Sequence, residues 1–183
     1  MKLIVLDRDG VINIDRKGPV VNAKQWVPID GSLEAIARLH QAGYQIAVTT
    51  NQSGIALELL TIEELHVIHA KMHDLVNKAG GKIDAIVFCP HSDSNQCDCR
   101  KPAPGMLYTL SERLDVDLEG VPVVGDSLRD VQAAMAAAAK PILVRTGKGQ
   151  DTIDNHKGLE HVPAYENLAE YVTELLATEA ENT

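Results

Sequence analysis

Two aspartates stand two residues apart near the start of this chain, in the segment Asp7-Arg8-Asp9-Gly10. An aspartate carboxylate can attack phosphorus and form an acyl-phosphate. A second carboxyl group nearby can protonate the leaving alkoxide and later take a proton from water. Two close carboxylates repel each other, which favours a bound cation, and Asp126 offers a third oxygen ligand of the kind that Mg²⁺ prefers. For the pair alone, the alternative is a turn that carries two solvated aspartates.

Groups that bind an anion occur further along the chain. Thr50 offers a hydroxyl group, and Ser53-Gly54 continues a turn rich in donors. In Arg100-Lys101 the lysine supplies a point charge and the arginine a forked donor for phosphate. Singly, the threonine can be a buried structural hydroxyl and the basic pair can be solvated. Together with the three aspartates, these groups predict a site for phosphoryl transfer that uses Mg²⁺.

Three cysteines and one histidine lie within eleven residues, as Cys89, His91, Cys97 and Cys99. Three thiolates and one imidazole complete the tetrahedral coordination of Zn²⁺ and leave no open position, so the predicted site is structural. The loop 89–99 is otherwise polar, and a bound metal supplies folding energy that such a loop lacks. The alternative is three free thiols beside an unrelated histidine.

Three further histidines, His66, His69 and His73, recur at the spacing of one helical face. A second metal site is one interpretation. We favour a solvated or half-buried helix face, because no carboxylate pair is placed to support a metal there.

The elements that must position these groups alternate along the chain. Short apolar runs predict buried strands, and amphipathic stretches predict helices. The carboxyl ends of parallel strands meet at one edge of a sheet, so polar groups that follow four of the strands are brought together. We predict strands at 3–6, 45–49, 83–88, 121–124 and 142–144. We predict helices from an Asp30-Gly31-Ser32 N-cap to Gly43, from a Thr61/Glu64 capping box to Gly80, and at 104–114, 127–138 and 166–176, with a frayed end at 178–183.

Length and composition restrict the function further. The 183 residues suit a single domain. A formal net charge of −9 and only 3% aromatic residues argue against a nucleic-acid partner. The longest apolar run, 133–139, is far shorter than a membrane span, and the N-terminal apolar run is too short for a signal peptide. We therefore expect a monomeric cytoplasmic protein without membrane or nucleic-acid partners.

Four ordered motifs resemble those of the haloacid dehalogenase (HAD) superfamily. The resemblance, over residues 1–147, implies a Rossmann-like α/β fold with a five-stranded parallel sheet in the order 5-4-1-2-3, helices on both faces and no cap domain. Together with the zinc loop, the motifs are more closely similar to those of the phosphatases that act on heptose 1,7-bisphosphate in lipopolysaccharide-core synthesis. The motifs are Asp7-Arg8-Asp9-Gly10-Val11-Ile12-Asn13, Thr50-Asn51-Gln52-Ser53-Gly54, Arg100-Lys101-Pro102 and Gly125-Asp126-Ser127.

The resemblance implies a role for each group. Asp7 is then the nucleophile and Asp9 the general acid and base, while Thr50 and Lys101 stabilise the phosphoryl group. Mg²⁺ is held by Asp7, the backbone carbonyl group of Asp9, and Asp126. The residues expected to contact a small phosphorylated sugar are Asp15, Arg16, Lys17, Gly18, Asn51, Gln52, Ser53 and Arg100.

The chain departs from the family pattern at two places. Leu57-Glu58 replaces the usual Arg-Gly, and Ala137 stands where glycine is common. Two other functions stay open. Histidinol-phosphate phosphatases of the same superfamily resemble this zinc loop, but they commonly carry an aspartate at the position of Ser53. A zinc-clipped binding module without catalysis is the other alternative, and the intact acidic residues and lysine of the motifs argue against it.

Overall fold

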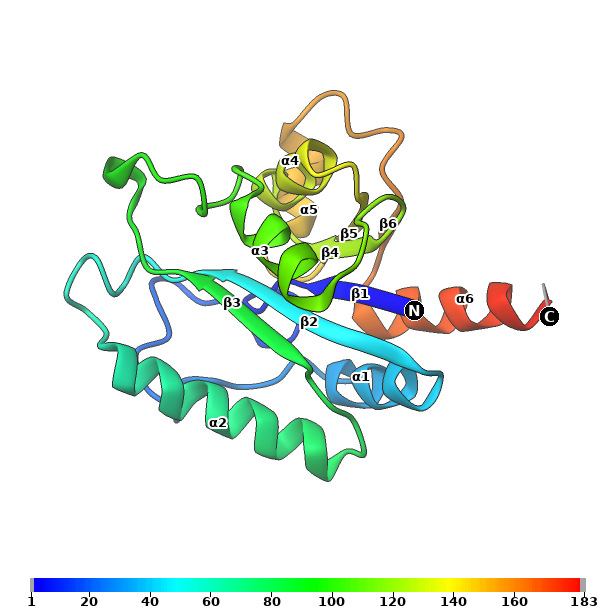
Figure 1. Cartoon of the computed structure of the whole chain (residues 1–183), viewed down its shortest axis with the longest axis horizontal. Helices are drawn as coiled ribbons and strands as arrows, with labels where there is room; N and C mark the ends of the chain where they lie inside the picture. The colour runs from blue at the N-terminus through cyan, green and yellow to red at the C-terminus, as the bar shows by residue number, and fades with distance from the viewer. Residues whose placement is uncertain (1, 182–183) are drawn as a thin grey trace.

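A computed structural model describes residues 2–181 as a parallel β-sheet with helices on both faces (Figure 1). Along this part of the chain no further domain is inserted between the elements. The strands are β1 (Lys2–Leu6), β2 (Tyr44–Asn51), β3 (Ala85–Cys89), β4 (Pro122–Gly125), β5 (Lys140–Val144) and β6 (Ala164–Tyr165). The helices are α1 (Ser32–Gln41), α2 (Ile62–Lys78), α3 (Gly105–Leu114), α4 (Leu128–Ala136), α5 (Gly149–Asn155) and α6 (Leu168–Glu181), with one 3₁₀ turn at Asp93–Asn95.

The sheet has six strands in the order β3-β2-β1-β4-β5-β6, all parallel. The predicted order of the first five strands is confirmed, and the predicted number is corrected from five to six. The extra strand is the two-residue β6, which pairs with Leu143 and Val144 at the edge of the sheet. Two residues that follow a proline form no apolar run, so the sequence pattern does not reveal them.

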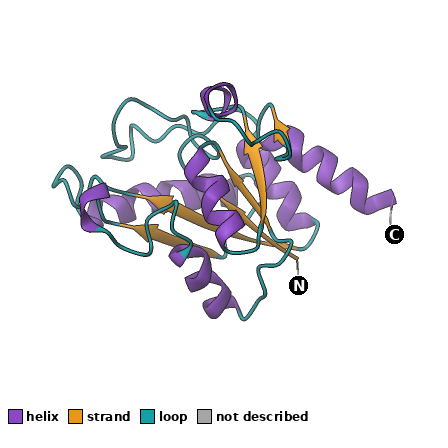
Figure 2. Cartoon of the chain, turned by 90° about the horizontal axis from the view of Figure 1, so that it is seen from above, coloured by secondary structure: helices purple, strands orange, loops and turns teal. Residues whose placement is uncertain are grey.

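The central strand shows why both faces of the sheet are covered. In β1, Ile4 and Leu6 pack on one side and Leu3 and Val5 on the other, because successive side chains of a strand point to opposite faces. The first core lies under α1, α2 and α6, and the second under α3 and α4. The ribbon views show these two layers of helices on either side of the strands (Figures 1 and 2). None of the helices within residues 2–181 is long and apolar enough to cross a membrane.

The predicted N-terminal cap is present at α2 and absent at α1. The capping box of α2 is confirmed, since the backbone N–H of Glu64 donates to the Thr61 hydroxyl at 3.1 Å and the Thr61 N–H donates to the Glu64 carboxylate at 2.8 Å. At α1 the predicted side-chain cap is absent. The Ser32 hydroxyl instead donates to the Val11 carbonyl at 2.9 Å, which ties the start of this helix to the first loop.

The C-terminal third differs most from the prediction. The polar helix α5 has no apolar periodicity and was not predicted. Helix α6 spans 168–181 rather than 166–176, because Glu179 accepts hydrogen bonds from Lys2 and the Tyr44 hydroxyl and so holds the last turns on the sheet. The predicted frayed end is therefore helical up to 181, and residues 182–183 lie outside the described part. Helix α4 spans 128–136, shorter than the predicted 127–138.

Candidate active site

One pocket of about 270 Å³ lies beyond the carboxyl ends of the strands and collects most of the predicted site residues. They come from four separate strand ends, as parallel topology predicts. Lys17 is the exception, because it does not line this pocket. The predicted residues that line it are Asp7, Asp9, Asp15, Arg16, Gly18, Thr50, Asn51, Gln52, Ser53, Arg100, Lys101 and Asp126.

Lys101 is the centre of a buried charge network. Its ammonium group donates to Asp7 at 2.9 Å, to Asp130 at 2.8 Å and to the carbonyl oxygen of Thr49 at 2.8 Å. Asp130 in turn accepts hydrogen bonds from the hydroxyl and backbone N–H of Ser127. Three acceptors around one ammonium group fix its position beside the carboxylate of Asp7.

Asp130 was missed in the sequence analysis. It lies four residues after Asp126, in the first turn of α4, and its side chain is buried. The available signal was the spacing of Ser127 and Asp130, three residues apart at the start of an amphipathic stretch, which is typical of a capping box. Its contact with Lys101 spans 29 residues of sequence.

Asp7, Asp126 and Asp130 bring three carboxylates together, with oxygens within 4.8 Å of one another. Burial and the neighbouring carboxylates raise the pKa of Asp7 to about 7 and that of Asp126 to about 8. Lys101 opposes this shift at Asp7, but one cation does not balance three anions. Closely spaced carboxylate oxygens with uncompensated repulsion fit a bound divalent cation such as Mg²⁺.

Two glycines make room for the carboxylate of Asp126. A Cβ atom on Gly10 would lie 2.1 Å from an oxygen of Asp126, and one on Gly147 would lie 2.2 Å from the same oxygen. Both glycines also have positive φ angles, 87° and 58°. The positive φ angle and the close approach to Asp126 together require a glycine at position 10.

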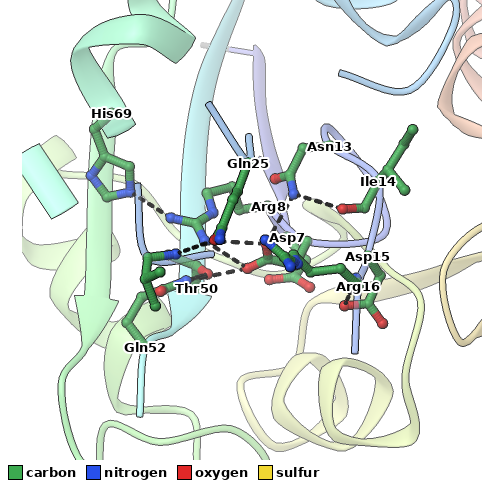
Figure 3. A network of polar contacts seen from close by, with 12 residues as sticks. Asp7, Arg8, Asn13, Ile14, Asp15, Arg16, Gln25, Thr50, Gln52 and His69 are labelled. Atoms are coloured by element: carbon green, nitrogen blue, oxygen red, sulfur yellow. Dashed lines mark hydrogen bonds and ion pairs between the residues drawn. The ribbon is translucent and has the colours of Figure 1, made fainter. Parts of the chain in front are cut away.

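Asp9 is fixed by three donors. Arg8 donates to both of its oxygens at 3.0 and 3.1 Å, and the Asn13 and Gln52 amides donate at 2.9 and 3.2 Å. Burial raises the pKa of this carboxyl, but Arg8 and the two amides outweigh that effect and hold it below its usual value. Gln52 also donates to the buried Thr50 hydroxyl at 2.9 Å, which links the ends of β1 and β2 (Figure 3).

The loop after β5 closes one side of the pocket and was not among the predicted site segments. The hydroxyl of Thr146 donates to the Gly10 carbonyl at 2.6 Å, and the backbone N–H of Lys148 donates to Asp126 at 2.8 Å. The Lys148 ammonium group lies 3.3 Å from Asp15. Lys148 and Arg129, which lies at the start of α4, add two cations to the pocket lining that were not predicted.

The four predicted zinc ligands converge. The three pairs of sulfur atoms of Cys89, Cys97 and Cys99 are 3.2 to 3.7 Å apart, and Nδ1 of His91 lies 3.2 Å from Cys99 and 3.6 Å from Cys89. A tetrahedron with zinc–sulfur bonds of about 2.3 Å has edges of about 3.8 Å. These spacings are too long for disulfides and fit a zinc ion, so the cluster is a possible zinc site.

The zinc loop also orients Arg100. Its Nε donates to Asp93 in the 3₁₀ turn at 2.5 Å, and Nη1 donates to the carbonyl of His91 at 3.3 Å. The side chain is only 12% exposed although it lines the pocket. Next to it, the backbone of Lys101 exchanges two hydrogen bonds with the amide of Asn51. The loop therefore places both cations from one short segment.

The three histidines of α2 do not form a second metal centre. Within residues 2–181, the groups of three or more converging metal-ligand side chains are the zinc cluster and the three pocket aspartates. His66 is exposed, His73 is half-buried and His69 is buried. This gradation of burial is that of a helix face that lies partly against the core.

The departures from the family pattern fall on unusual backbone positions. Glu58, which stands where the resemblance implies glycine, has a φ of 57°. At the second departure, the residue with a positive φ is Ala138, whose φ is 56°. It lies one position after Ala137, where glycine was expected. Leu57 is 57% exposed and does not line the pocket.

A Rossmann-like sheet with nucleophile, base and cation candidates at its strand ends defines the class of HAD-like hydrolases. Residues 98–175 match the family model described as HAD-hydrolase-like.

Curated relatives give the family. The chain is 49% identical over 173 residues to the D-glycero-beta-D-manno-heptose-1,7-bisphosphate 7-phosphatase of Neisseria meningitidis serogroup A, covering 93% of this chain and 92% of the relative. It is 48% identical to the enzyme of that name from Pseudomonas putida, covering 96% and 100%. The chain therefore belongs to the D-glycero-beta-D-manno-heptose-1,7-bisphosphate 7-phosphatase family.

A solved structure agrees with this assignment. The crystal structure of D,D-heptose 1,7-bisphosphate phosphatase from B. bronchiseptica complexed with magnesium and phosphate is 48% identical, with a TM-score of 0.95 over 97% of this chain and 99% of that one.

Proposed function

We propose that this chain removes the C7 phosphate of D-glycero-D-manno-heptose 1,7-bisphosphate, a step toward the heptose of the lipopolysaccharide core. The observation that carries the proposal is the placement of Asp7. It lines a pocket with Lys101 at 2.9 Å, in a chain that matches phosphatases of this name along nearly their whole length. The curated relatives favour this substrate over histidinol phosphate.

The residues support a reaction in two displacements. In the first, a carboxylate oxygen of Asp7 attacks phosphorus, the bond to the C7 oxygen breaks, and the leaving alkoxide takes a proton from Asp9. In the second, Asp9 takes a proton from water, the resulting hydroxide attacks phosphorus, and the acyl-phosphate bond breaks. Inorganic phosphate leaves, Asp7 is again a carboxylate, and Asp9 is again protonated.

The surroundings of Asp9 suit both proton transfers. Arg8, Asn13 and Gln52 favour its ionised form, which is the form that accepts a proton from water. A bound phosphate monoester adds negative charge to the pocket and raises the pKa of Asp9, which favours the protonated form needed for the leaving alkoxide. Thr50 then supplies a hydroxyl donor, and Lys101 a positive charge, for the phosphoryl oxygens.

Two metal ions complete the proposal. The groups that would hold Mg²⁺ are Asp7, Asp126 and the backbone carbonyl of Asp9. When bound, Mg²⁺ neutralises charge on the phosphoryl group and between the carboxylates. Zn²⁺ would be held by the three cysteines and His91 of the zinc loop, where it has a structural role.

The second phosphate of the substrate needs its own cations, because the chain as a whole carries a net charge of −9. Arg16, Arg100, Arg129 and Lys148 all line the pocket. A charge-assisted contact with phosphate contributes about 1.5–3 kcal/mol. A bisphosphate therefore gains affinity that a monophosphate lacks.

Phosphate release with Mg²⁺ tests the function. Heptose 1,7-bisphosphate, histidinol phosphate and a nucleoside monophosphate are compared, and the product is analysed for the position of the remaining phosphate. We expect one phosphate per bisphosphate, with C1 still phosphorylated, and no turnover by Asp7→Asn, since an amide cannot form the acyl-phosphate. Equal turnover of histidinol phosphate would reject the substrate, and an active Asp7→Asn variant would reject the mechanism.

A further inference from the structure

The two terminal nitrogens of the Arg8 guanidinium group each have a partner. The side chain is completely buried, and its Nη2 donates to both oxygens of Asp9. The other terminal nitrogen, Nη1, lies 3.3 Å from Nε2 of His69 on α2 (Figure 3). The remaining guanidinium nitrogen, Nε, has no partner among the described residues. A buried guanidinium with so few partners depends strongly on each of them.

His69 is built to accept a hydrogen bond. Its ring is only 6% exposed and stacks edge-on against Phe88 with a centroid distance of 6.3 Å. An arginine offers only donors, so Nε2 of His69 must be the acceptor and the ring proton must reside on Nδ1. Burial and the positive charge of Arg8 lower the pKa of His69 to about 3, which keeps the ring neutral.

We propose that His69 is a positioning residue for the reaction: by accepting from Arg8 it fixes the guanidinium group that in turn orients the carboxylate of Asp9. This inference rests on the proposed function, in which Asp9 transfers the protons. Both bonds to Asp9 come from the single nitrogen Nη2, which faces the two carboxylate oxygens together, so a rotation of Arg8 would move this donor away from the carboxylate. A displacement of about 1 Å at a reacting group costs up to about 100-fold in rate.

Leaving groups of different basicity give a test that a merely structural role would not pass. A sugar alkoxide must be protonated as it leaves, whereas p-nitrophenolate is a weak base and leaves without a proton. The ratio kcat/KM covers the steps up to release of the leaving group, so it reports on the acid role of Asp9. His69→Leu removes the acceptor. It should lower kcat/KM for heptose 1,7-bisphosphate about 10-fold and leave the value for p-nitrophenyl phosphate within about twofold.

Three matched variants make the result specific. His69→Gln keeps an acceptor oxygen and should retain kcat/KM for both substrates within about threefold. His66→Leu changes an exposed histidine that lines the same small hollow as His69 and should alter neither value. If circular dichroism shows that His69→Leu does not fold, His69→Met replaces it as the variant without a ring acceptor.

Asp9→Asn separates this inference from the proposed function. It should lower kcat/KM for the bisphosphate by about 10²–10⁴ and affect p-nitrophenyl phosphate far less. If Asp9→Asn affects both substrates equally, the acid role in the proposed function is wrong. The positioning role of His69 is overturned, and the function stands, in either of two outcomes. In the first, Asp9→Asn affects the bisphosphate more than p-nitrophenyl phosphate but His69→Leu affects both equally. In the second, His69→Gln loses as much activity as His69→Leu.

Discussion

The ammonium nitrogen of Lys101 lies 2.8 Å from an oxygen of Asp130, and the two side chains are only 7% and 4% exposed. Burial alone would lower the pKa of Lys101, but Asp130 and Asp7 together raise it well above its usual value. The lysine therefore stays charged beside the candidate nucleophile. Asp130 is thus a counter-ion of Lys101 that the reaction does not consume. Asp7 can therefore face a phosphoryl group while the lysine keeps a buried partner.

Removal of Asp130 should destabilise the protein. Asp130→Ala leaves a buried ammonium group with one carboxylate instead of two, and we expect the free energy of unfolding to fall by about 3 kcal/mol. Ser127→Ala removes only one hydroxyl donor to Asp130 and should cost about 1–2 kcal/mol. Urea denaturation without Mg²⁺ measures both. An Asp130→Ala variant as stable as the parent would show that this ion pair contributes nothing net.

Arg100 should discriminate between substrates with one and two phosphates. We expect Arg100→Ala to lower kcat/KM for heptose 1,7-bisphosphate by about 10–100-fold, which is the value of a charge-assisted contact. The value for p-nitrophenyl phosphate should change little. Lys17→Ala is the matched control, because this lysine lies outside the pocket lining and should affect neither substrate. Equal losses on both substrates after Arg100→Ala would argue against contact with a second phosphate.

The zinc loop should depend on its metal. Native mass spectrometry of protein purified under reducing conditions should show one zinc per chain, and Cys97→Ser should lose it. Because this loop carries Arg100 and Lys101, the variant should also have a lower melting temperature and lower activity. Ser94→Ala, in the same loop, should keep the zinc. Parent protein without zinc, or with a disulfide among these cysteines, would contradict the prediction.

His69 should make the protein less stable in acid. Its pKa is about 3 in the folded protein and about 6.5 in an unfolded chain, so the unfolded state binds the extra proton between these values. Stability should therefore fall as the pH drops below about 6.5, by about 2 kcal/mol at pH 5. His69→Gln should lose this part of the pH dependence, and the exposed His66→Gln should retain it. Urea titrations at pH 5 and pH 7 measure the free energy of unfolding. An equal change between the two pH values in the parent and in His69→Gln would contradict the prediction.

Ala138 offers a stabilising substitution. A non-glycine residue in the left-handed region costs about 1–2 kcal/mol, and glycine costs about 0.4–1 kcal/mol in unfolded-state entropy. We expect Ala138→Gly to stabilise the protein by about 0.5–1 kcal/mol. Ala137→Gly, at a φ of −94°, has no strain to relieve and should destabilise it by about 0.5–1 kcal/mol. The two melting temperatures should move in opposite directions, and a shift in the same direction would refute the argument.

Much of this protein could be predicted from short stretches of sequence. The buried strand at Leu3 to Leu6, the capping box at Thr61 and the spacing of the zinc ligands each depend on residues within a few positions of one another. Such patterns are set by the fixed periods of strands, helices and coordination geometry, which do not require knowledge of the rest of the chain.

The tertiary structure alone decided which distant side chains meet. The pairing of Asp130 with Lys101 and the closing of the β5 loop over Asp126 depend on how parallel strands are aligned and how the loops beyond them run. The same loop paths leave Lys17 outside the pocket while its neighbours Arg16 and Gly18 line it. The reason is physical: residue type and local period fix what a segment can form, whereas contacts between strand ends arise only when the sheet has assembled.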